Sequence, residues 1–357
     1  MSVGELNLYP SPMSFVLYGA NGYTGKLIID VALREGLKPV LAGRRREAIE
    51  PLAKEHGLES LVFSLDEPAR AAEALAGKKA LLLAAGPFSK TSRPALDACL
   101  LAKTAYLDIT GEVDVFEALF ARDAEARKAG IAVLPGTGFD VVPSDCLAKS
   151  LAEALPGAET LKLAFRGFKT SAGTAKTMIE GLPKGGRARI GGELVTVPAA
   201  WKTMTVPFPD KPRLAMTIPW GDLSTAFRST GIPNIEVYMA VSPAAIAASR
   251  RMRLFAPLLG LAPVQAFLKK RAAARVGPNQ EEREREKSYL WGRVTKGDRE
   301  VTATLETLEG YALTAETSVA IVARVLKGEV PPGVLTPSQA FGSGFIETIR
   351  GSRRREA

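Results

Sequence analysis

The chain has 357 residues, enough for two domains with a sizeable core, and its 46% hydrophobic and 24% charged residues are ordinary for a globular protein. Its formal net charge is +9, but the basic residues are scattered and accompany no helix-turn-helix, zinc-finger or RNA-binding motif. We therefore expect an anionic small molecule or an acidic surface as the partner, and no nucleic acid.

Histidine and cysteine usage narrows the chemistry. The only cysteines are Cys99 and Cys146, which argues against a disulfide framework, excludes a cysteine-rich zinc site and is typical of a reducing compartment. No metal site is expected. The only histidine, His56, precedes Gly57 at a predicted helix end, so catalysis by a Ser-His-Asp triad is excluded.

Residues 1–13 lack the basic segment and long apolar core of a signal peptide, and we expect them to form a disordered leader. No run reaches the ~18 apolar residues of a membrane span. We therefore expect a cytoplasmic protein.

The first predicted strand, Phe15–Tyr18, leads into a glycine-rich turn, and a predicted helix and a second strand, Pro39–Ala42, follow. Glycines at this spacing let the backbone approach a pyrophosphate, whose charge the N–H groups of the helix start would meet. The same glycines could form a tight turn in any α/β protein, but the flanking strand and helix favour a dinucleotide site. Cofactor contacts are expected from Gly19, Ala20, Asn21, Gly22, Tyr23, Thr24 and Gly25.

The end of the second strand indicates which dinucleotide is bound. An NAD site places a carboxylate there to hold the ribose 2′-hydroxyl, whereas this chain has Arg44 and Arg45 and no carboxylate before Glu47. Guanidinium groups suit a 2′-phosphate, so NADP(H) is the expected cofactor. The alternative is that both arginines lie on a solvated helix start, where their charge opposes the helix dipole.

Strands alternate with helices up to Leu134, which predicts an α/β fold with a Rossmann-type doubly wound parallel sheet of six strands. Asp66 closes the third strand and is expected to touch the adenine or, alternatively, to cap the next helix. The fourth strand ends in a small-residue loop that would let the cofactor lie against backbone. That loop adds Ala85, Gly86 and Pro87 to the expected cofactor contacts.

Two polar loops follow later strands, Tyr106–Glu112 and Pro135–Asp145, where ligands of such sheets bind. Alternatively, Asp140, Ser144 and Asp145 cap the helix that follows. The candidates for polarising a substrate or delivering a proton are Tyr106, Asp108, Asp140, Ser144 and Lys176, the last on a predicted helix capped by Ser171.

From Ala158 short alternating stretches, such as Ile190–Val197, predict a second α+β domain built on a mainly antiparallel sheet. Large aromatics there, including Trp220, either line a pocket or pack in the core. Segment 250–271 has basic ends around an apolar centre. It suits a membrane interface or a hydrophobic substrate entrance, and the alternative is a buried helical hairpin with exposed basic ends.

These motifs together resemble the saccharopine dehydrogenase-like oxidoreductases, and within that family the sequence is most similar to the trans-acting enoyl reductase branch. The resemblance spans Ser14 to about Gly344, although the amino-acid-binding motifs of saccharopine-forming enzymes cannot be matched. The segments that carry it are Tyr18–Gly25, Ala42–Arg44, Ala85–Phe88, Tyr106–Glu112, Gly138–Asp145, Ser171–Thr174, Gly277–Pro278, Glu309–Tyr311 and Gly333–Pro337.

The resemblance implies a division of the chain into an NADP-binding Rossmann domain (14–148), a substrate and dimerisation domain (149–310) and a C-terminal helix and tail (311–357) that pack back on the first domain. The tail 350–355 is expected to be frayed. Members of the enoyl reductase branch are proposed to reduce a double bond in a growing polyketide-type lipid with NADPH. By analogy, a homodimer through the second-domain sheet is also expected.

The leading hypothesis is an NADPH-dependent oxidoreductase that reduces a C=C or C=N bond of a small or lipid-like substrate. An enoyl substrate would predict an apolar tunnel near 254–264. A saccharopine-type imine would predict basic residues around a carboxylate, for which Arg166, Lys169, Arg187 and Arg189 are available. The rivals are a non-catalytic NADP-binding protein and a peripheral membrane protein anchored through 250–271.

Overall fold

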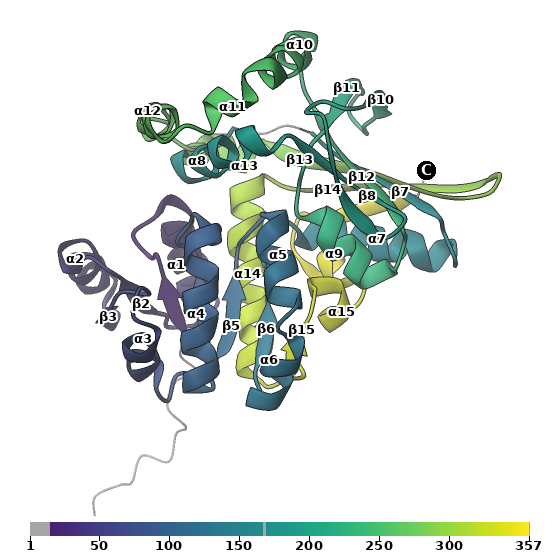
Figure 1. Cartoon of the computed structure of the whole chain (residues 1–357). Coiled ribbons are helices and arrows are strands. Elements are labelled where there is room, and N and C mark those ends of the chain that lie inside the picture. Colours follow the sequence, from purple (N-terminus) through teal and green to yellow (C-terminus); the bar gives the residue numbers. More distant parts are fainter. Residues whose placement is uncertain (1–14, 167–168, 357) are drawn as a thin grey trace, which may run out of the picture.

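The computed structural model describes residues 15–166 and 169–356, so the leader predicted for 1–13 lies outside the described residues. Two sheets organise the chain, a seven-stranded sheet in the lower half of Figure 1 and a nine-stranded sheet above it. The division into domains at 148/149 and 310/311 stays a prediction.

The first sheet is parallel throughout, with the strand order β15-β6-β5-β4-β1-β2-β3. Its central strands are buried on both faces, as their continuous apolar runs predict. The Rossmann-type sheet is therefore confirmed. A seventh strand, contributed by a two-residue segment near the C-terminus, was not predicted. The strands are β1 (Val16–Tyr18), β2 (Val40–Gly43), β3 (Ser60–Val62), β4 (Ala80–Leu83), β5 (Ala105–Asp108), β6 (Ala132–Leu134) and β15 (Gly333–Val334).

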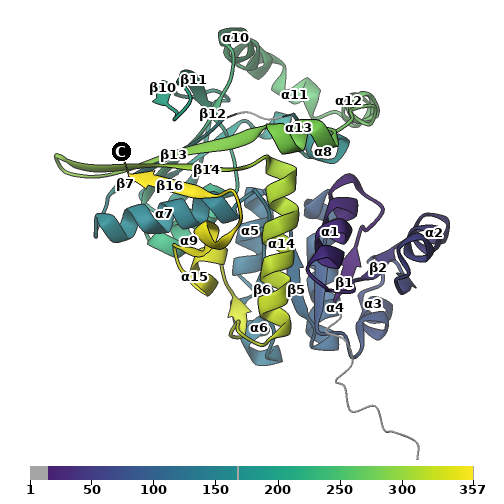
Figure 2. The same cartoon turned by 180° about the vertical axis from the view of Figure 1, so that it is seen from behind.

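Helices cover both faces of this sheet. Helices α4, α5 and α6 lie in front of it in Figure 1, and α1 and α14 lie side by side on the other face in Figure 2. His56 is the last residue of α2, and Gly57 closes that helix with a φ of 63°, as the sequence predicts. The helices are α1 (Tyr23–Arg34), α2 (Arg46–His56), α3 (Pro68–Leu75), α4 (Phe88–Ala102), α5 (Val113–Phe120), α6 (Asp123–Ala129) and α14 (Gly310–Leu326).

The second sheet has the path β10-β11-β12-β7-β13-β14-β16, with the hairpin β8–β9 attached to β12. All its pairings except β12 with β7 are antiparallel, which confirms the mainly antiparallel domain. Segment 190–197, predicted as one strand, is instead a turn and a strand, because Gly191 and Gly192 have positive φ and reverse the chain. The strands are β7 (Thr160–Arg166), β8 (Gly186–Ile190), β9 (Glu193–Val197), β10 (Thr203–Pro207), β11 (Pro212–Thr217), β12 (Asn234–Ala240), β13 (Lys287–Lys296), β14 (Arg299–Leu308) and β16 (Arg353–Glu356).

Helices border this sheet on both sides. Helices α7, α9 and α15 lie between the two sheets, and α8 and α10–α13 lie at the far end of the molecule (Figure 1). They are α7 (Val142–Ala154), α8 (Ala172–Gly181), α9 (Asp222–Thr230), α10 (Pro243–Met252), α11 (Ala256–Leu259), α12 (Ala262–Ala272), α13 (Gln280–Arg285) and α15 (Pro337–Phe341), with short 3₁₀ turns η1 (Leu182–Lys184), η2 (Arg253–Phe255) and η3 (Phe345–Thr348).

The C-terminal segment returns to both sheets. Helix α14 packs beside α1, and β15 extends the parallel sheet next to β6. The tail expected to be frayed instead forms β16, which pairs with β14 from Ala303↔Glu356 to Glu306↔Arg353. Unpaired backbone groups at the edge of β14 explain this, because an edge strand accepts a further strand.

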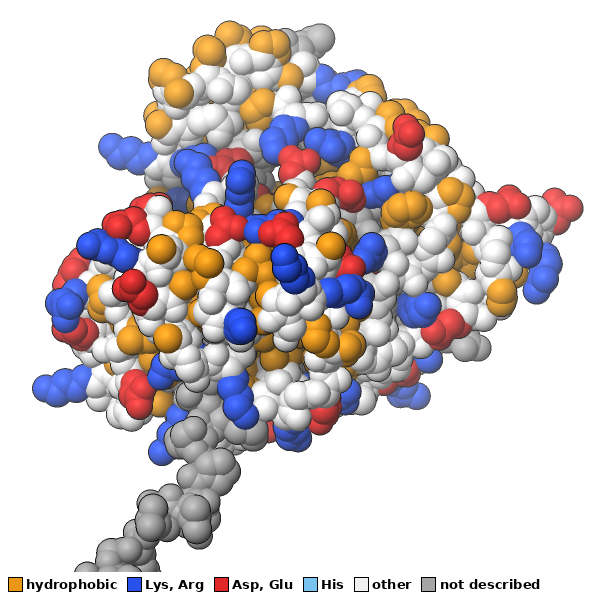
Figure 3. Space-filling model, turned by 60° about the horizontal axis from the view of Figure 1, so that its bottom comes forward, with side chains coloured by type: hydrophobic (Ala, Val, Ile, Leu, Met, Phe, Trp, Pro, Cys, Tyr) orange, Lys and Arg blue, Asp and Glu red, His pale blue; other side chains and the backbone are white. Residues whose placement is uncertain are grey.

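The surface of the lower half mixes charges. Figure 3 shows Lys and Arg side chains interspersed with Asp and Glu over that face. In the part of the chain that the structure describes, no helix has the length and apolar character needed to cross a membrane.

Candidate nucleotide and substrate site

The glycine-rich turn connects β1 to α1 with very close backbone packing. Gly19 has a φ of 89°, and a Cβ atom placed there would lie 2.8 Å from the nitrogen of Ala85. A Cβ atom on Gly25 would lie 2.5 Å from the Gly19 carbonyl oxygen. Side chains are therefore excluded at both positions, and the loop after β4 lies directly against the loop after β1.

Helix α1 begins at Tyr23 without the usual capping groups. Its N-cap is Gly22, no described side chain bonds to the cap, and no acidic residue lies in its first turn. The N–H groups at a helix start need partners, and the helix dipole favours an anion there. An open helix start behind a close-packed glycine turn is the geometry that binds a pyrophosphate.

Arg44 and Arg45 follow β2 at the same edge of the sheet. Both are exposed, and neither side chain bonds to any residue within the described ranges. Arg44 is close enough to Tyr18, the last residue of β1, for its charge to lower the pKa of that phenol, although burial raises it more. Two unpaired guanidinium groups beside the glycine turn are available to an anionic ligand.

The second domain closes over the glycine turn at Tyr23. The Tyr23 hydroxyl donates to the Pro278 carbonyl (2.5 Å) and accepts from Nη1 of Arg283 (3.0 Å). Its ring lies edge-on to Tyr311 with centroids 5.0 Å apart. Tyr311 in turn accepts from the Ser171 N–H (2.6 Å), so the starts of α1, α8 and α14 meet at two phenols in edge-on contact.

Asp140 lies at the end of the β6 loop beside Gly111 and Trp220. A Cβ atom on Gly111 would lie 2.7 Å from Oδ2 of Asp140 and 2.9 Å from Nε1 of Trp220. Burial and then the charge of Asp222 raise the pKa of Asp140 well above its usual value, while a hydrogen bond from Trp220 opposes this. The pKa of Tyr311 is raised mainly by burial, and the charge of Asp140 raises it further. A carboxyl group with a raised pKa thus lies within electrostatic reach of the Tyr311 phenol.

Asp222 is fully buried behind this group. Among the described residues neither of its carboxyl oxygens has a hydrogen-bond partner. The Ser144 hydroxyl is near enough to lower the pKa of Asp222, but it donates its hydrogen bond to the Val141 carbonyl at 3.0 Å. Burial therefore raises the pKa of Asp222 to about 7.

Comparison with known proteins relates this geometry to a family. Residues 19–107 match the NAD(P)H-binding family model. The chain is 28% identical over 154 residues to the mouse saccharopine dehydrogenase-like oxidoreductase and 34% identical over 146 residues to the trans-acting enoyl reductase of Mycobacterium leprae. The chain is thus similar in sequence to saccharopine dehydrogenase-like oxidoreductases and to trans-acting enoyl reductases. The aligned parts cover 38% and 36% of this chain and only 36% and 33% of those two relatives.

A solved structure extends the likeness to the whole fold. The apo saccharopine dehydrogenase (L-Glu forming) of Saccharomyces cerevisiae superposes with a TM-score of 0.66 over 97% of this chain and 100% of that one, at 14% identity. The two proteins share the overall fold. The match of residues 19–107 to the NAD(P)H-binding model lies within the parallel sheet, so this part of the chain is an NAD(P)H-binding domain.

Tyr106 and Asp108, predicted as catalytic, are both fully buried. The Tyr106 hydroxyl donates to Oδ2 of Asp108 (2.6 Å), while Oδ1 accepts from the N–H groups of Thr110 (3.0 Å) and Gly136 (2.8 Å). Burial raises the pKa of Asp108 to about 6 despite these bonds. The pair joins the ends of β5 and β6, and the expected contact of either side chain with substrate stays a prediction.

Ser144 is also fully buried and bonds only within its own helix start. Neither it nor Asp145 nor Asp140 caps α7, because the N-cap is Val141 and no described side chain bonds to the cap. Asp145 instead accepts from the Ser338 N–H at 2.7 Å. Of the predicted polar residues in this loop, only Asp140 stays partly exposed at the strand ends.

Lys176 lies in the second turn of α8 and is half-buried. Its amine bonds to no residue in the ranges that the structure describes. Because α8 starts against Tyr311, Lys176 remains a candidate for a substrate or phosphate contact.

Asp66 is exposed and accepts from the Ser64 hydroxyl at 2.8 Å, so it does not cap α3, whose N-cap is Glu67. Gly86 is exposed in the loop after β4, next to the glycine turn. Glu112 holds this loop in place, since its carboxylate accepts from the N–H groups of Phe88 (2.9 Å) and Ser89 (3.2 Å).

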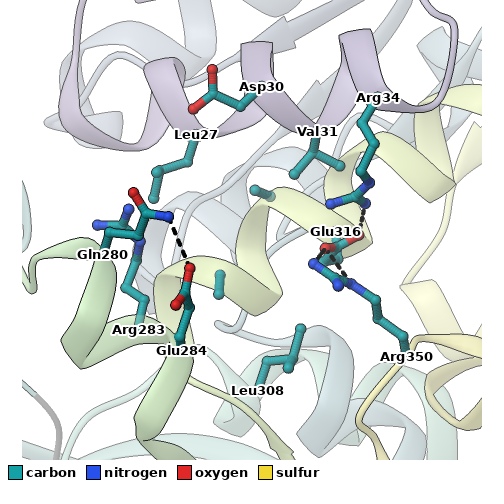
Figure 4. Close-up of a pocket in the computed structure, with 12 residues that line it drawn as sticks. Leu27, Asp30, Val31, Arg34, Gln280, Arg283, Glu284, Leu308, Glu316 and Arg350 are labelled. Atoms are coloured by element: carbon teal, nitrogen blue, oxygen red, sulfur yellow. Dashed lines mark hydrogen bonds and ion pairs between the residues drawn. The ribbon is translucent and has the colours of Figure 1, made fainter.

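A separate cavity of about 380 Å³ lies between α1, α13 and α14. Figure 4 shows Leu27 and Val31 projecting into it from α1, with charged side chains around them. Glu316 pairs with Arg34 (2.6 Å) and Arg350 (2.7 Å). None of the predicted site residues is among the described residues that line this cavity.

The sequence did not single out Tyr311 as a site residue, and it left Trp220 undecided between pocket and core. Tyr311 was visible only within the Glu309–Tyr311 motif. Glu309 is the N-cap of α14 and accepts from the N–H groups of Tyr311 (2.9 Å) and Ala312 (3.1 Å). A capping carboxylate next to a tyrosine was the available signal, but nothing local indicated that the ring meets Tyr23.

Proposed function

We propose that the protein is an NADPH-dependent reductase that adds hydrogen across the C=C bond of an apolar, lipid-like substrate. The observation that carries the cofactor preference is the pair of exposed, unpaired guanidinium groups of Arg44 and Arg45 beside the close-packed glycine turn. A planar fork suits the ribose 2′-phosphate that distinguishes NADP from NAD. The open start of α1 would hold the pyrophosphate.

When bound, NADPH supplies the hydride, and the chain's own residues position the reactants and provide the proton. Asp140 is the proposed acid, because it lies beside Gly111 and Trp220 at the strand ends and burial raises the pKa of its carboxyl well above the usual value, which favours the proton-bearing form. Addition of hydride to one alkene carbon leaves negative charge that the carbonyl oxygen conjugated to the alkene shares. Transfer of the Asp140 proton to the second carbon completes the reduction, and solvent then reprotonates the carboxylate.

The charge pattern of the second domain favours a C=C bond over an imine formed from an amino acid. An imine of that kind carries carboxylates, which free basic side chains must bind. The four residues available for this are already in ion pairs: Arg166 with Asp210, Lys169 with Glu282, Arg187 with Asp114 and Arg189 with Glu117. An uncharged substrate needs none of them.

The test is a titration with NADPH and NADH, followed by tryptophan fluorescence, for the native chain and for the double variant Arg44→Asp with Arg45→Ala. We expect the native chain to bind NADPH much more tightly than NADH. Two charge-assisted contacts of about 1.5–3 kcal/mol each predict a loss of at least ~100-fold in NADPH affinity for the variant. Lys54→Asp, near the other end of α2, is the matched control.

Reduction is then assayed with an α,β-unsaturated thioester and with an imine of an amino acid and a keto acid. Oxidation of NADPH by the thioester alone supports the proposal, and oxidation by the imine alone contradicts the choice of bond. Tight NADPH binding without turnover of any carbonyl, imine or enoyl compound would favour the non-catalytic binding protein. Failure to bind either nucleotide would reduce the glycine turn to architecture.

A further inference from the structure

Helices α10, α11 and α12 and the residues around them form a helical arm, defined as residues 243–276. In Figure 1 the three helices lie in a row at the end of the molecule opposite the parallel sheet. The sequence left a buried helical hairpin and a membrane contact open for this segment. The hairpin is wrong, because among the described side chains of 243–276 only those of Ile246 and Ala272 are buried.

The helical arm concentrates the exposed apolar surface of the protein. Nine large hydrophobic side chains are exposed in the described ranges, and six of them belong to the arm. The four in the middle of the row have exposed fractions of 50–59%, so at least half of each residue's surface is accessible to a partner. The six are Met252, Phe255, Leu258, Leu261, Phe267 and Val276.

The charge of the helical arm has one sign. Seven basic residues and no acidic residue occur in 243–276. Within the described part of the chain, Lys269 alone among them is ion-paired, with Glu180 at 2.5 Å. The other six lie exposed: Arg250, Arg251, Arg253, Lys270, Arg271 and Arg275. This differs from the interspersed charges of the opposite end (Figure 3).

Polar contacts fix the helical arm to α8 and leave its other sides outward. Nε2 of Gln265 donates to the carbonyls of Ile179 (3.0 Å) and Leu259 (2.7 Å). The Lys269 ion pair also reaches α8, because Glu180 lies near its C-terminus. These contacts attach the arm to α8, and its short helices expose their apolar side chains on the sides that α8 does not cover.

We propose that the helical arm docks the protein on the surface of a bilayer that contains anionic phospholipid. Apolar side chains would enter the boundary between headgroups and acyl chains, and the arginines and lysines beside them would lie among the phosphates. The charge complementarity is direct, since the arm carries only positive charge. This inference does not depend on the proposed reductase activity.

Two other occupants fit the helical arm less well. A second copy of the chain would bring two unpaired basic surfaces together, and like charges in contact are unfavourable. An acidic protein would need a surface complementary in shape to three short helices separated by turns. A fluid lipid surface has no such requirement and takes up protruding side chains wherever they lie.

The helical arm lies close to the candidate site, so docking on a membrane would affect how a substrate reaches that site. Helix α8, on which the arm rests, has Ser171 as its N-cap, and that residue bonds to Tyr311 at the candidate site. A docked molecule would therefore hold its site next to the membrane. Lipid-like substrates could then pass from the bilayer along α8.

The test is co-sedimentation of the full chain with vesicles of phosphatidylcholine alone or with about 30% phosphatidylglycerol. The native chain is expected to bind only the anionic vesicles, and less as salt rises. The charge variant Arg251→Gln, Lys270→Gln, Arg271→Gln should bind about 100-fold less, because each basic residue near an anionic surface contributes about fivefold. The apolar variant Phe255→Ser, Leu258→Ser, Phe267→Ser should lose binding at all salt concentrations.

Matched controls place the same changes elsewhere. Lys38→Gln, Lys54→Gln, Lys128→Gln removes three exposed charges from the parallel-sheet domain, and Leu101→Ser with Ile190→Ser removes exposed apolar side chains. Both controls should bind vesicles like the native chain, and thermal unfolding checks that every variant is folded. The proposal is overturned if the native chain ignores anionic vesicles, if the arm variants bind as well as the controls, or if the apolar variant abolishes only a self-association seen without lipid.

Discussion

The glycine turn and the Asp140 group are two halves of one site that are built in opposite ways. The turn consists of seven consecutive residues that would contact the ligand through their backbone, and side chains are excluded at Gly19 and Gly25. The acid group depends on the side chains of Asp140, Trp220 and Tyr311 and on the absence of a side chain at Gly111, four positions from distant segments. Local sequence can specify the first kind of site, whereas only the folded chain specifies the second.

The two halves also differ in electrostatics. Around the glycine turn the helix start and exposed arginines favour negative charge. Around Asp140 burial and two neighbouring carboxyls disfavour it, which raises the pKa values of Asp140 and Asp222. The glycine turn therefore suits an anionic ligand and the Asp140 group an uncharged one. Substitutions in each half should change either nucleotide affinity or turnover.

Asp140→Asn should produce the largest effect and should affect only one half. If Asp140 delivers the proton, kcat for enoyl reduction falls by about 10²–10⁴-fold, while NADPH affinity stays at the native value. The measurement is steady-state kinetics beside a fluorescence titration, with Asp30→Asn, an exposed carboxyl of α1, as control. An unchanged kcat would remove Asp140 from the proton step, and an equal loss of NADPH affinity would mean that the two halves are not separable.

Asp222→Asn should change how stability depends on pH. The pKa of Asp222 is raised from 3.8 to about 7, so the folded chain binds more protons than the unfolded chain between about pH 4 and 7. Native stability therefore falls as pH rises through this window, and the variant lacks that part of the fall. Only about two units of this shift lie between pH 5 and 8, so at about 1.4 kcal/mol per pKa unit the variant should gain up to about 3 kcal/mol relative to the native chain over that range.

Urea unfolding at both pH values measures this change. Asp140 and Asp145 have raised pKa values too, so the variant should keep part of the pH dependence. Parallel pH curves for the native chain and the variant would show that Asp222 keeps its ordinary pKa, and the electrostatic contrast between the halves would weaken.

Tyr311→Phe should give the smallest effect, at the contact that joins the halves. The change removes the acceptor of the buried Ser171 N–H and the partner of the Thr174 hydroxyl (2.8 Å). We expect a loss of about 1–2 kcal/mol in unfolding free energy, since a buried donor is left without a partner. Tyr289→Phe, whose hydroxyl bonds to nothing in the described ranges, should have no effect in the same urea titration.

The sequence predicted the parallel sheet well because its evidence is local. Strands such as Ala80–Leu83 read as continuous apolar runs, and helix ends such as His56–Gly57 carry their own signals. The β8–β9 turn was missed because a pair of glycines can lie in a strand or reverse it. The seventh strand, two residues long, has no pattern of its own and forms because the edge of β6 is there to receive it.

The candidate site was predictable only where backbone binds ligand. Tyr106 and Asp108 looked catalytic since polar residues at strand ends commonly face a ligand. Whether a carboxylate faces solvent or the neighbouring loop depends on the Gly136 N–H, which lies 28 residues away in sequence. The helical arm was ambiguous for a similar reason, because an apolar segment becomes buried or exposed according to what the rest of the chain leaves free.

The return of residues 333–356 to both sheets has a consequence for how the protein is made. Strand β15 closes one edge of the parallel sheet and β16 one edge of the second sheet, and both are translated after every other strand of those sheets. During synthesis, the edges of β6 and β14 therefore stay unpaired until this segment leaves the ribosome. Unpaired strand edges promote aggregation, so we expect chaperones to bind the nascent chain at this stage.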